Sequence, residues 1–301
     1  MHLEKFDLNL LVAIEALMRH RNVTTASAEL LITQSALSSA LNRARQHFGD
    51  KILYYDGQQM VPTPFGAELE NLVPEMIAQL RALTRMRAQT DLTQTKRRFT
   101  IVASDYVAAV YVSALSKVLA QRAPGVSLSV VPFTQESISM FQRGVVEFFI
   151  APGFAANDDY EAELLFEDTF QCVLCSDNPV LRSGLDAKTF FSSPHVVTDF
   201  FVMDGKSHFE RWLDEQGREI KVAASLPNFV VLPYYIPGTR NIATVHKRLV
   251  PFFENIPGMT FLNPPVTVPP LQEYLVTNYK QQHDPETRML RDLMMEVGRD
   301  L

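Results

Sequence analysis

Apolar residues in the first fifty positions recur at the spacing of amphipathic helices. A first helix is predicted over residues 7–19, with Asp7 at its start. A short second helix follows with Thr24 as its expected N-cap, and a third covers residues 34–47 after the N-cap Thr33. The apolar positions that we expect to face a common core are Leu10, Ala13, Ile14, Leu17, Ala26, Leu30, Leu37, Leu41, Ala44 and Phe48.

The polar face of the third predicted helix differs from an ordinary solvated face, which favours Glu and Lys. It carries hydroxyls, amides and arginines, with no acidic residue between Thr33 and Gly49. Such side chains read base edges and phosphates in the major groove of DNA. An amphipathic helix with an unusual polar face is the alternative. The residues expected to contact DNA on and before this helix are Thr33, Gln34, Ser35, Ser38, Ser39, Asn42, Arg43 and Arg45.

Residues 51–61 contain two short β-like runs around Asp56-Gly57, a favoured hairpin turn. A short helix, a tight connection, a longer helix and a hairpin form a winged helix-turn-helix, whose second helix enters the groove. Gln58 and Gln59 then lie where they reach the DNA backbone or minor groove. A hairpin that only covers the core is the alternative. The DNA-binding domain is expected over residues 1–63.

A heptad pattern follows in residues 65–87, with Pro74 inside it as a source of a kink. Such a seam indicates a partner helix, so residues 64–91 are predicted to form a linker and dimerisation helix. A helix packed on its own C-terminal domain is the alternative. The seam residues expected at the dimer interface are Leu69, Val73, Met76, Leu80 and Leu83.

From Arg97 onward, short β-rich runs alternate with helical patterns. This alternation predicts an α/β domain over residues 92–301, with ligands bound beyond the carboxyl ends of parallel strands. The pattern is clear in its first half and weaker in the second. The expected strands cover residues 99–103, 127–131, 147–151, 170–175, 196–198, 222–224, 242–245 and 271–276, and the expected helices cover 105–122, 136–143, 207–216, 228–235 and 286–297.

The 301 residues suffice for two domains, and 47% of them are hydrophobic. The net charge of −6 lies entirely after residue 90, because residues 1–90 carry nine basic and nine acidic side chains. The chain is therefore not a polycation that coats nucleic acid, and DNA binding must use a local surface. Two cysteines, no apparent signal peptide and no long apolar run predict a cytoplasmic protein that makes no membrane contact.

Candidate chemistry is sparse. Cys172 and Cys175 have a C-x2-C spacing, but no second cysteine pair or nearby histidine completes a zinc site, so buried structural thiols are expected. Neither a Gly-rich phosphate loop nor a nucleophile elbow occurs. The acidic residues Asp158, Asp159, Glu161 and Glu163 are expected in a solvated loop. We therefore expect no enzyme, no metal and no cofactor.

The N-terminal motifs are similar to those of LysR-type transcriptional regulators, and the similarity extends over the whole chain. They are Asp7-Leu-Asn-Leu-Leu11, Asn22-Val-Thr-Thr-Ala26, Thr33-Gln-Ser-Ala-Leu-Ser38 and Val61-Pro-Thr-Pro64 with Gly66. Within the family the chain most resembles the NodD-type subgroup and regulators of chlorinated phenol degradation. It departs from the family pattern at Ser35, where proline is usual, and at Ile52-Leu53 and Tyr55 in the wing.

The resemblance implies a two-lobed effector domain like a small periplasmic-binding fold, with an inducer between the lobes. Lobe one is then expected at about residues 97–165 and 271–301, and lobe two at about 166–270. Hydroxyls with aromatic rings suit a small aromatic or phenolic inducer, although each aromatic ring can equally be core packing. The expected pocket residues are Ser104, Asp105, Tyr106, Phe133, Thr134, Pro152, Phe154, Thr198, Asp199, Phe200 and Tyr234.

The resemblance also implies antiparallel pairing of linker helices in a homodimer that assembles to a homotetramer. Its partners would be palindromic double-stranded DNA and RNA polymerase, and its mode would be activation. Two other classes stay open: an α/β enzyme or solute-binding protein with a helical N-terminal module, and an architectural DNA binder that senses nothing.

Overall fold

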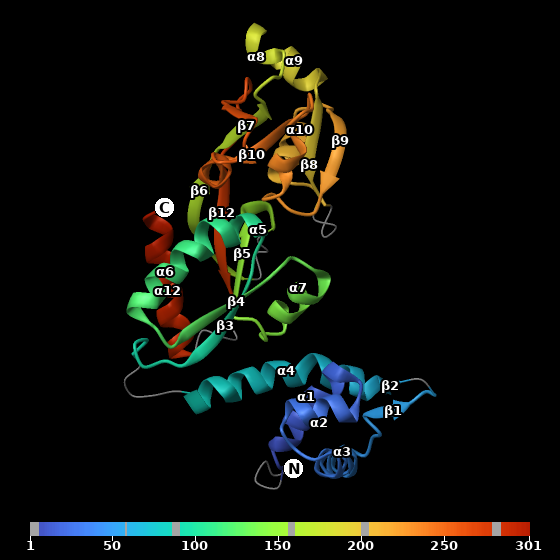
Figure 1. Ribbon diagram of the computed structural model, residues 1–301. Coiled ribbons are helices and arrows are strands. Elements are labelled where there is room, and N and C mark those ends of the chain that lie inside the picture. The colour runs from blue at the N-terminus through green and yellow to red at the C-terminus, as the bar shows by residue number, and fades with distance from the viewer. Residues whose placement is uncertain (1–5, 58, 86–90, 156–159, 200–204, 279–283) are drawn as a thin grey trace. The chain divides into compact units, whose positions relative to one another are not determined.

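A computed structural model describes residues 6–57, 59–85, 91–155, 160–199, 205–278 and 284–301 (Figure 1). The chain divides into two units, residues 1–87 with 143–145, and residues 88–142 with 146–301. The elements of the first unit are α1 (Asn9–His20), α2 (Val23–Glu29), α3 (Gln34–Phe48), β1 (Leu53–Tyr55), β2 (Met60–Pro62) and α4 (Pro64–Arg85). The three predicted helices, the hairpin and the long helix are all present.

The helices of the first unit enclose a core formed by their predicted apolar faces. Ile14, Leu17 and Leu37 are completely buried there together with Ile52. The cap of α2 differs from the prediction. Asn22, not Thr24, is the N-cap, because its Oδ1 accepts a hydrogen bond from the Thr25 amide at 3.1 Å.

Two ion pairs attach α4 to α1 within this unit. Arg21 binds Glu70 through Nη2 at 2.7 and 2.8 Å, and Arg81 binds the buried Glu15 at 3.0 Å. Arg19 also binds Glu15 at 2.9 Å. Because these contacts span nearly three turns of α4, this part of the long helix is fixed to the helix-turn-helix.

The second unit contains two five-stranded sheets, which define two lobes. In lobe one the strand order is β4-β3-β5-β12-β6, in which β3, β4 and β5 are parallel and β12 is antiparallel to both neighbours. The bounds of these strands are β3 (Arg97–Val102), β4 (Val126–Val131), β5 (Phe148–Pro152), β6 (Glu161–Asp168) and β12 (Leu271–Thr277).

Helices cover both faces of this sheet. Ile101 of β3 belongs to the same core cluster as Leu115 of α6 and Leu290 of α12, whereas its neighbour Val102 belongs to a cluster with Phe141 of α7. Figure 1 shows α6 and α12 side by side. The remaining elements of lobe one are α5 (Asp105–Val107), the π-helical segment η2 (Ala108–Val112), α6 (Ser113–Arg122), α7 (Gln135–Gln142), η3 (Gly153–Ala155) and α12 (Pro285–Arg299).

Lobe two has the strand order β11-β7-β10-β8-β9, with β8, β9 and β10 parallel. Its strands are β7 (Phe170–Cys175), β8 (Pro194–Thr198), β9 (Lys221–Leu226), β10 (Ile242–His246) and β11 (Met259–Leu262). Its helices are α8 (Val180–Ser183), α9 (Ala187–Ser192), α10 (His208–Glu215), η4 (Leu232–Tyr235), η5 (Lys247–Leu249) and α11 (Val250–Phe253).

The prediction of a solvated acidic loop is wrong for its second half. Glu161 and Glu163 begin β6, an edge strand, and Arg291 of α12 binds Glu163 at 2.5 Å. An edge strand with one solvated face tolerates such acidic residues. The hydrophobic pattern therefore did not predict this strand. Asp158 and Asp159 lie outside the described residues.

Candidate DNA-reading and effector-binding sites

The helix α3 presents an exposed polar face. Thr33 caps it, accepting the Ala36 amide at 3.2 Å, and the opposite face is buried. The predicted DNA contacts that are solvent-exposed are Thr33, Gln34, Ser35, Ser38, Ser39, Asn42 and Arg43. No acidic side chain lies among them, so the face suits the edges and phosphates of DNA.

The first turn of α3 is tied to α2. Gln34 Nε2 donates to Thr24 Oγ1 at 3.1 Å, and the Thr33 and Ser35 hydroxyls lie 3.0 Å apart. Thr24 therefore lies beside the predicted DNA-reading face, a position that the sequence analysis did not anticipate. The free carbonyl oxygen of the Gln34 amide remains able to accept from a base.

Arg45 has a structural role that the sequence did not predict. Its Nε donates to the Lys51 carbonyl at 2.8 Å and its Nη2 to the Leu53 carbonyl at 2.6 Å, while Nη1 reaches Asn42 at 3.3 Å. The expectation that Arg45 contacts DNA is corrected: its side of α3 faces the start of the wing, and two of its donors bind carbonyl groups there.

Arg43 keeps an exposed guanidinium. It pairs with Asp7 at 3.0 Å, with 56% of its side chain exposed. The pKa of Asp7 is lowered by hydrogen bonds from Asn9 first and by Arg43 second. Surface pairs of this kind are weak, so Arg43 can exchange Asp7 for a phosphate. Gln58 of the wing lies outside the described residues, and Gln59 is exposed.

The predicted seam on α4 divides between two faces. Leu69 and Val73 are buried in the core of the first unit, so these two are corrected from dimer contacts to core residues. Leu80 is partly buried and packs against that core. Met76 and Leu83 are exposed, and Leu72 lies on the same side of the helix. A heptad pattern does not show which of its members an N-terminal domain will cover.

The parallel strands of the two lobes end toward one another. In lobe one β3 and β5 lead to Ser104 and Pro152, and in lobe two β8 ends at Thr198. Asp105 Oδ2 accepts the Val230 amide at 2.8 Å, which joins the start of α5 to the segment after β9. The carboxyl ends of both sheets therefore border one interlobe region, the usual ligand position in such folds.

The predicted pocket residues have different surroundings. Ser104 is buried and caps α5, accepting the Val107 amide at 3.2 Å. Thr198 Oγ1 is buried and has no hydrogen-bond partner among the described residues. Thr134 is exposed and caps the start of α7 through the Ser137 amide at 3.0 Å. Hydroxyls are therefore present on both sides of the interlobe region.

The aromatic residues of the predicted pocket are mostly placed elsewhere. Tyr106 is completely buried, and its ring stacks on that of His246 with 4.0 Å between the ring centroids. It is therefore corrected to a core residue. Phe133 packs on Phe149 with 5.4 Å between the ring centroids, and Tyr234 is 66% exposed. Phe200 and the side chain of Phe154 lie outside what the structure describes. Asp199 donates its amide to the Leu226 carbonyl at 2.8 Å, and this leaves it at the end of β8.

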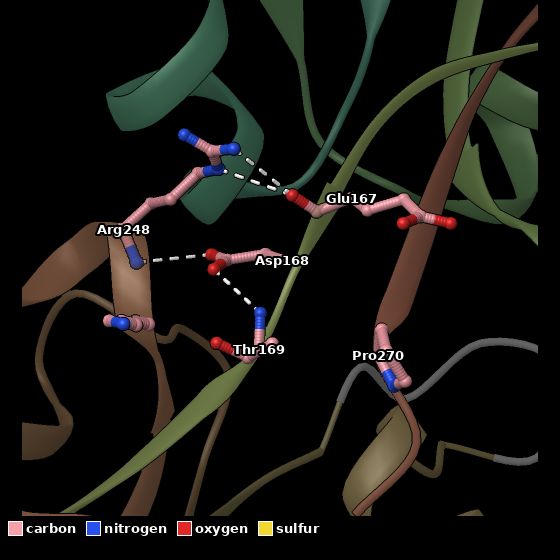
Figure 2. A pocket seen from close by; sticks show the side chains of 6 residues that line it. Glu167, Asp168, Thr169, Arg248 and Pro270 are labelled. Carbon is pink, nitrogen blue, oxygen red and sulfur yellow. Dashed lines mark hydrogen bonds between the residues drawn. The ribbon is translucent and has the colours of Figure 1, made fainter.

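The chain crosses between lobes at Thr169, beside polar residues that the sequence did not single out. Asp168 accepts from the Tyr106 hydroxyl at 2.8 Å and from the Arg248 amide at 3.1 Å. Burial raises the pKa of Asp168, and burial together with Asp168 raises the pKa of Glu273 to about 8. Figure 2 shows the adjoining pocket of about 450 Å³, lined by Glu167, Asp168, Thr169, Lys247, Arg248 and Pro270.

The described residues offer little other chemistry. Cys172 and Cys175 are both buried free thiols, and burial raises the pKa of Cys172 to about 12, which keeps its thiol protonated. Among the described residues no group of histidine, cysteine and carboxylate side chains is arranged to hold a metal ion. No helix in the described part of the chain has the length and apolar character to span a membrane.

Comparison with known families assigns both parts of the chain. Residues 8–67 match the bacterial regulatory helix-turn-helix protein, lysR family, and residues 93–299 match the LysR substrate binding domain. The chain belongs to the LysR family of transcriptional regulators. This LysR-type regulator is 31% identical over 296 residues to nodulation protein D 3 of Rhizobium leguminosarum bv. phaseoli, covering 98% of each chain. It is 30% identical over 299 residues to nodulation protein D 1 of Rhizobium meliloti, covering 98% of this chain and 96% of that one.

Solved structures share the fold. A probable transcriptional regulator from Pseudomonas aeruginosa is 28% identical, with a TM-score of 0.69 and 97% of each chain covered. Full-length OxyR from the same organism is 14% identical, with a TM-score of 0.76, and covers 99% of this chain and 96% of its own. These matches place the LysR-type regulator among proteins with an N-terminal helix-turn-helix and a two-lobed α/β effector domain. The family consists of regulators, not enzymes.

Proposed function

We propose that the protein is a homo-oligomeric transcriptional activator that reads DNA through α3 and responds to a small aromatic or phenolic effector. The exposed face of α3, which lacks any acidic residue, carries the DNA-reading part of this proposal. Gln34, Ser38 and Asn42 supply donors and acceptors for base edges, and Arg43 supplies a cation for a phosphate or guanine.

Dimerisation uses the outer side of α4 in this proposal. Leu72, Met76 and Leu83 leave large apolar surfaces exposed on one side of the helix, while the ion pairs to α1 fix the other side. Two such helices that bury these residues bring two copies of α3 onto one DNA duplex. The operator is then palindromic, with half-sites separated by about one helical turn. Two dimers form a tetramer.

The effector binds between the carboxyl ends of the two sheets. The buried hydroxyl of Thr198, without a partner among the described residues, favours a ligand with a phenolic or carbonyl oxygen. Asp105 meets the Val230 amide across the lobes. A ligand with different affinity for two arrangements of the lobes shifts their equilibrium, and the linker helices carry this change to the spacing of the two DNA-reading modules and to RNA polymerase.

A DNase I footprint of the full-length protein on the DNA upstream of its own gene tests this function. We expect two protected half-sites, and one member of a panel of phenols, hydroquinones and flavonoids is expected to shorten or shift the protection. Thr198→Val should abolish the effector response and leave the ligand-free footprint unchanged. A footprint that no compound alters would contradict the effector part, and the absence of a footprint would contradict the whole proposal.

A further inference from the structure

Two carboxyl groups are buried side by side where the chain crosses between the lobes. Asp168 ends β6 and Glu273 lies on the neighbouring strand β12, where it pairs with Phe166. Residues two apart on a strand share a face, so both side chains point to the same side of the sheet, and they are 5% and 3% exposed. Buried carboxylates are costly without compensation.

The two carboxyl groups have unequal partners. Asp168 accepts from the Tyr106 hydroxyl at 2.8 Å, the Thr169 amide at 2.7 Å and the Arg248 amide at 3.1 Å. Glu273 Oε2 has no hydrogen-bond partner among the described residues. Burial raises the pKa of Asp168, but three donors oppose this effect and favour its ionised form. The single proton that such a pair keeps near neutral pH therefore resides on Glu273, consistent with its pKa of about 8.

The positive charge of Arg248 acts on Asp168 and opposes the effect of burial on its pKa. The hydrogen bonds of the Arg248 guanidinium go to the Glu167 carbonyl at 3.2 Å and to the Leu301 carbonyl oxygen. Burial lowers the pKa of His246 to about 3, so the ring that stacks on Tyr106 is uncharged. His208 lies beyond Phe170, with its pKa also lowered by burial, and the exposed Glu167 is bound to Gln272 at 2.6 Å.

Asp168 also lies at a connection between the two lobes. Tyr106 reaches it from α5 of lobe one, and the Arg248 amide reaches it from η5 of lobe two. We propose that Asp168 and Glu273 form a proton-operated hinge, in which loss of the Glu273 proton places a second negative charge beside Asp168 and releases this connection. The pocket of Figure 2 is lined in part by Asp168, so it reaches one member of the pair.

The direction of the pH effect follows from the raised pKa. In the unfolded chain Glu273 has the usual glutamate pKa of about 4.3. In the folded chain its pKa is about 8. The folded state therefore binds more protons across this range, and its stability falls as the pH rises through it. Above about pH 8 the stability contributed by protonated Glu273 is lost, and ionised Glu273 weakens the hinge.

Infrared spectroscopy of the full-length protein tests where the proton resides. We expect the carbonyl stretch of a buried protonated carboxylic acid at pH 7, its disappearance by pH 9.5, and its absence from Glu273→Gln. The matched control Glu167→Gln, which changes an exposed carboxylate on the neighbouring strand β6, should keep the band. A wild-type protein without the band at pH 7, or Glu273→Gln with it, would overturn the inference.

Two further measurements test the hinge itself. In urea, the unfolding constant of the wild type should rise about tenfold per pH unit relative to Glu273→Gln between pH 6 and 8. Hydrogen exchange of the Arg248 amide, corrected for intrinsic rates, should accelerate at least tenfold between pH 7 and 9 in the wild type only. Equal acceleration in both proteins would refute a hinge role. No step involves DNA or an effector, so failure here leaves the proposed function untouched, and the reverse also holds.

Discussion

Neighbouring residues of one kind take different roles on the recognition helix. Arg43 and Arg45 look equivalent in the sequence, yet Arg45 is committed to the carbonyl groups of the wing and Arg43 is exposed. The two positions lie on different sides of α3, and only the folded hairpin supplies the acceptors for one of them. Residue type and spacing therefore predicted the DNA-reading face but not which of its members were already used.

Alanine substitutions separate these two roles. Arg43→Ala should lower the slope of log affinity against log salt by about 1 per subunit, because one phosphate contact is lost, with unfolding unchanged. Arg45→Ala should lower the free energy of unfolding of the first unit by about 1–3 kcal/mol, because its charge-assisted hydrogen bonds are lost. Salt titrations by anisotropy and urea unfolding measure the two effects. Reversed results would show that the assignments are interchanged.

Gly66 is a single residue on which the wing depends. A Cβ at this position would lie 2.0 Å from the Ile52 carbonyl oxygen, because the first turn of α4 crosses the start of the wing at close range. We expect Gly66→Ala to destabilise the first unit by about 1–3 kcal/mol and to weaken DNA binding. The control Ala67→Gly is exposed and should cost about 1 kcal/mol without affecting DNA affinity, as urea unfolding and anisotropy will measure.

At the scale of elements, strong periodicity predicted most of the molecule. The helices and strands of the first unit and the strand at 170–175 lie where the patterns indicated, because each has one clearly apolar face or a buried run. The edge strand β6 was not predicted because glutamates occupy its start, and β11 was not predicted either. The helical stretch expected at 228–235 contains only η4 at Leu232–Tyr235, since Pro233 breaks a longer helix.

The outer side of α4 carries a prediction about assembly. Met76→Lys places a charge in the centre of the exposed apolar side, so the dimer dissociation constant should rise at least about tenfold for a lost apolar contact. Asn71→Lys is the control, since Asn71 is exposed on another side of the helix. Sedimentation velocity over a range of concentrations distinguishes them. Equal behaviour of the two variants would place the dimer interface elsewhere.

At the scale of the whole molecule, the division between a neutral DNA-reading unit and an acidic effector unit was visible in the distribution of charge. The two-lobed arrangement was expected from family resemblance, since no pattern in the sequence predicts how ten strands divide between two sheets. The buried pair Asp168 and Glu273 could not be anticipated, because nothing in a strand pattern distinguishes a buried carboxyl group from a solvated one.

We propose that α3 reads DNA by its exposed polar side chains. Fluorescence anisotropy with labelled upstream DNA, in the presence of increasing unlabelled random DNA, tests it most directly for wild type and Gln34→Ala. We predict wild-type affinity for the upstream site at least about a thousandfold above that for random DNA at physiological salt. Gln34→Ala should reduce only the specific affinity, by about tenfold. Equal affinities of the wild type for both DNAs would contradict the account.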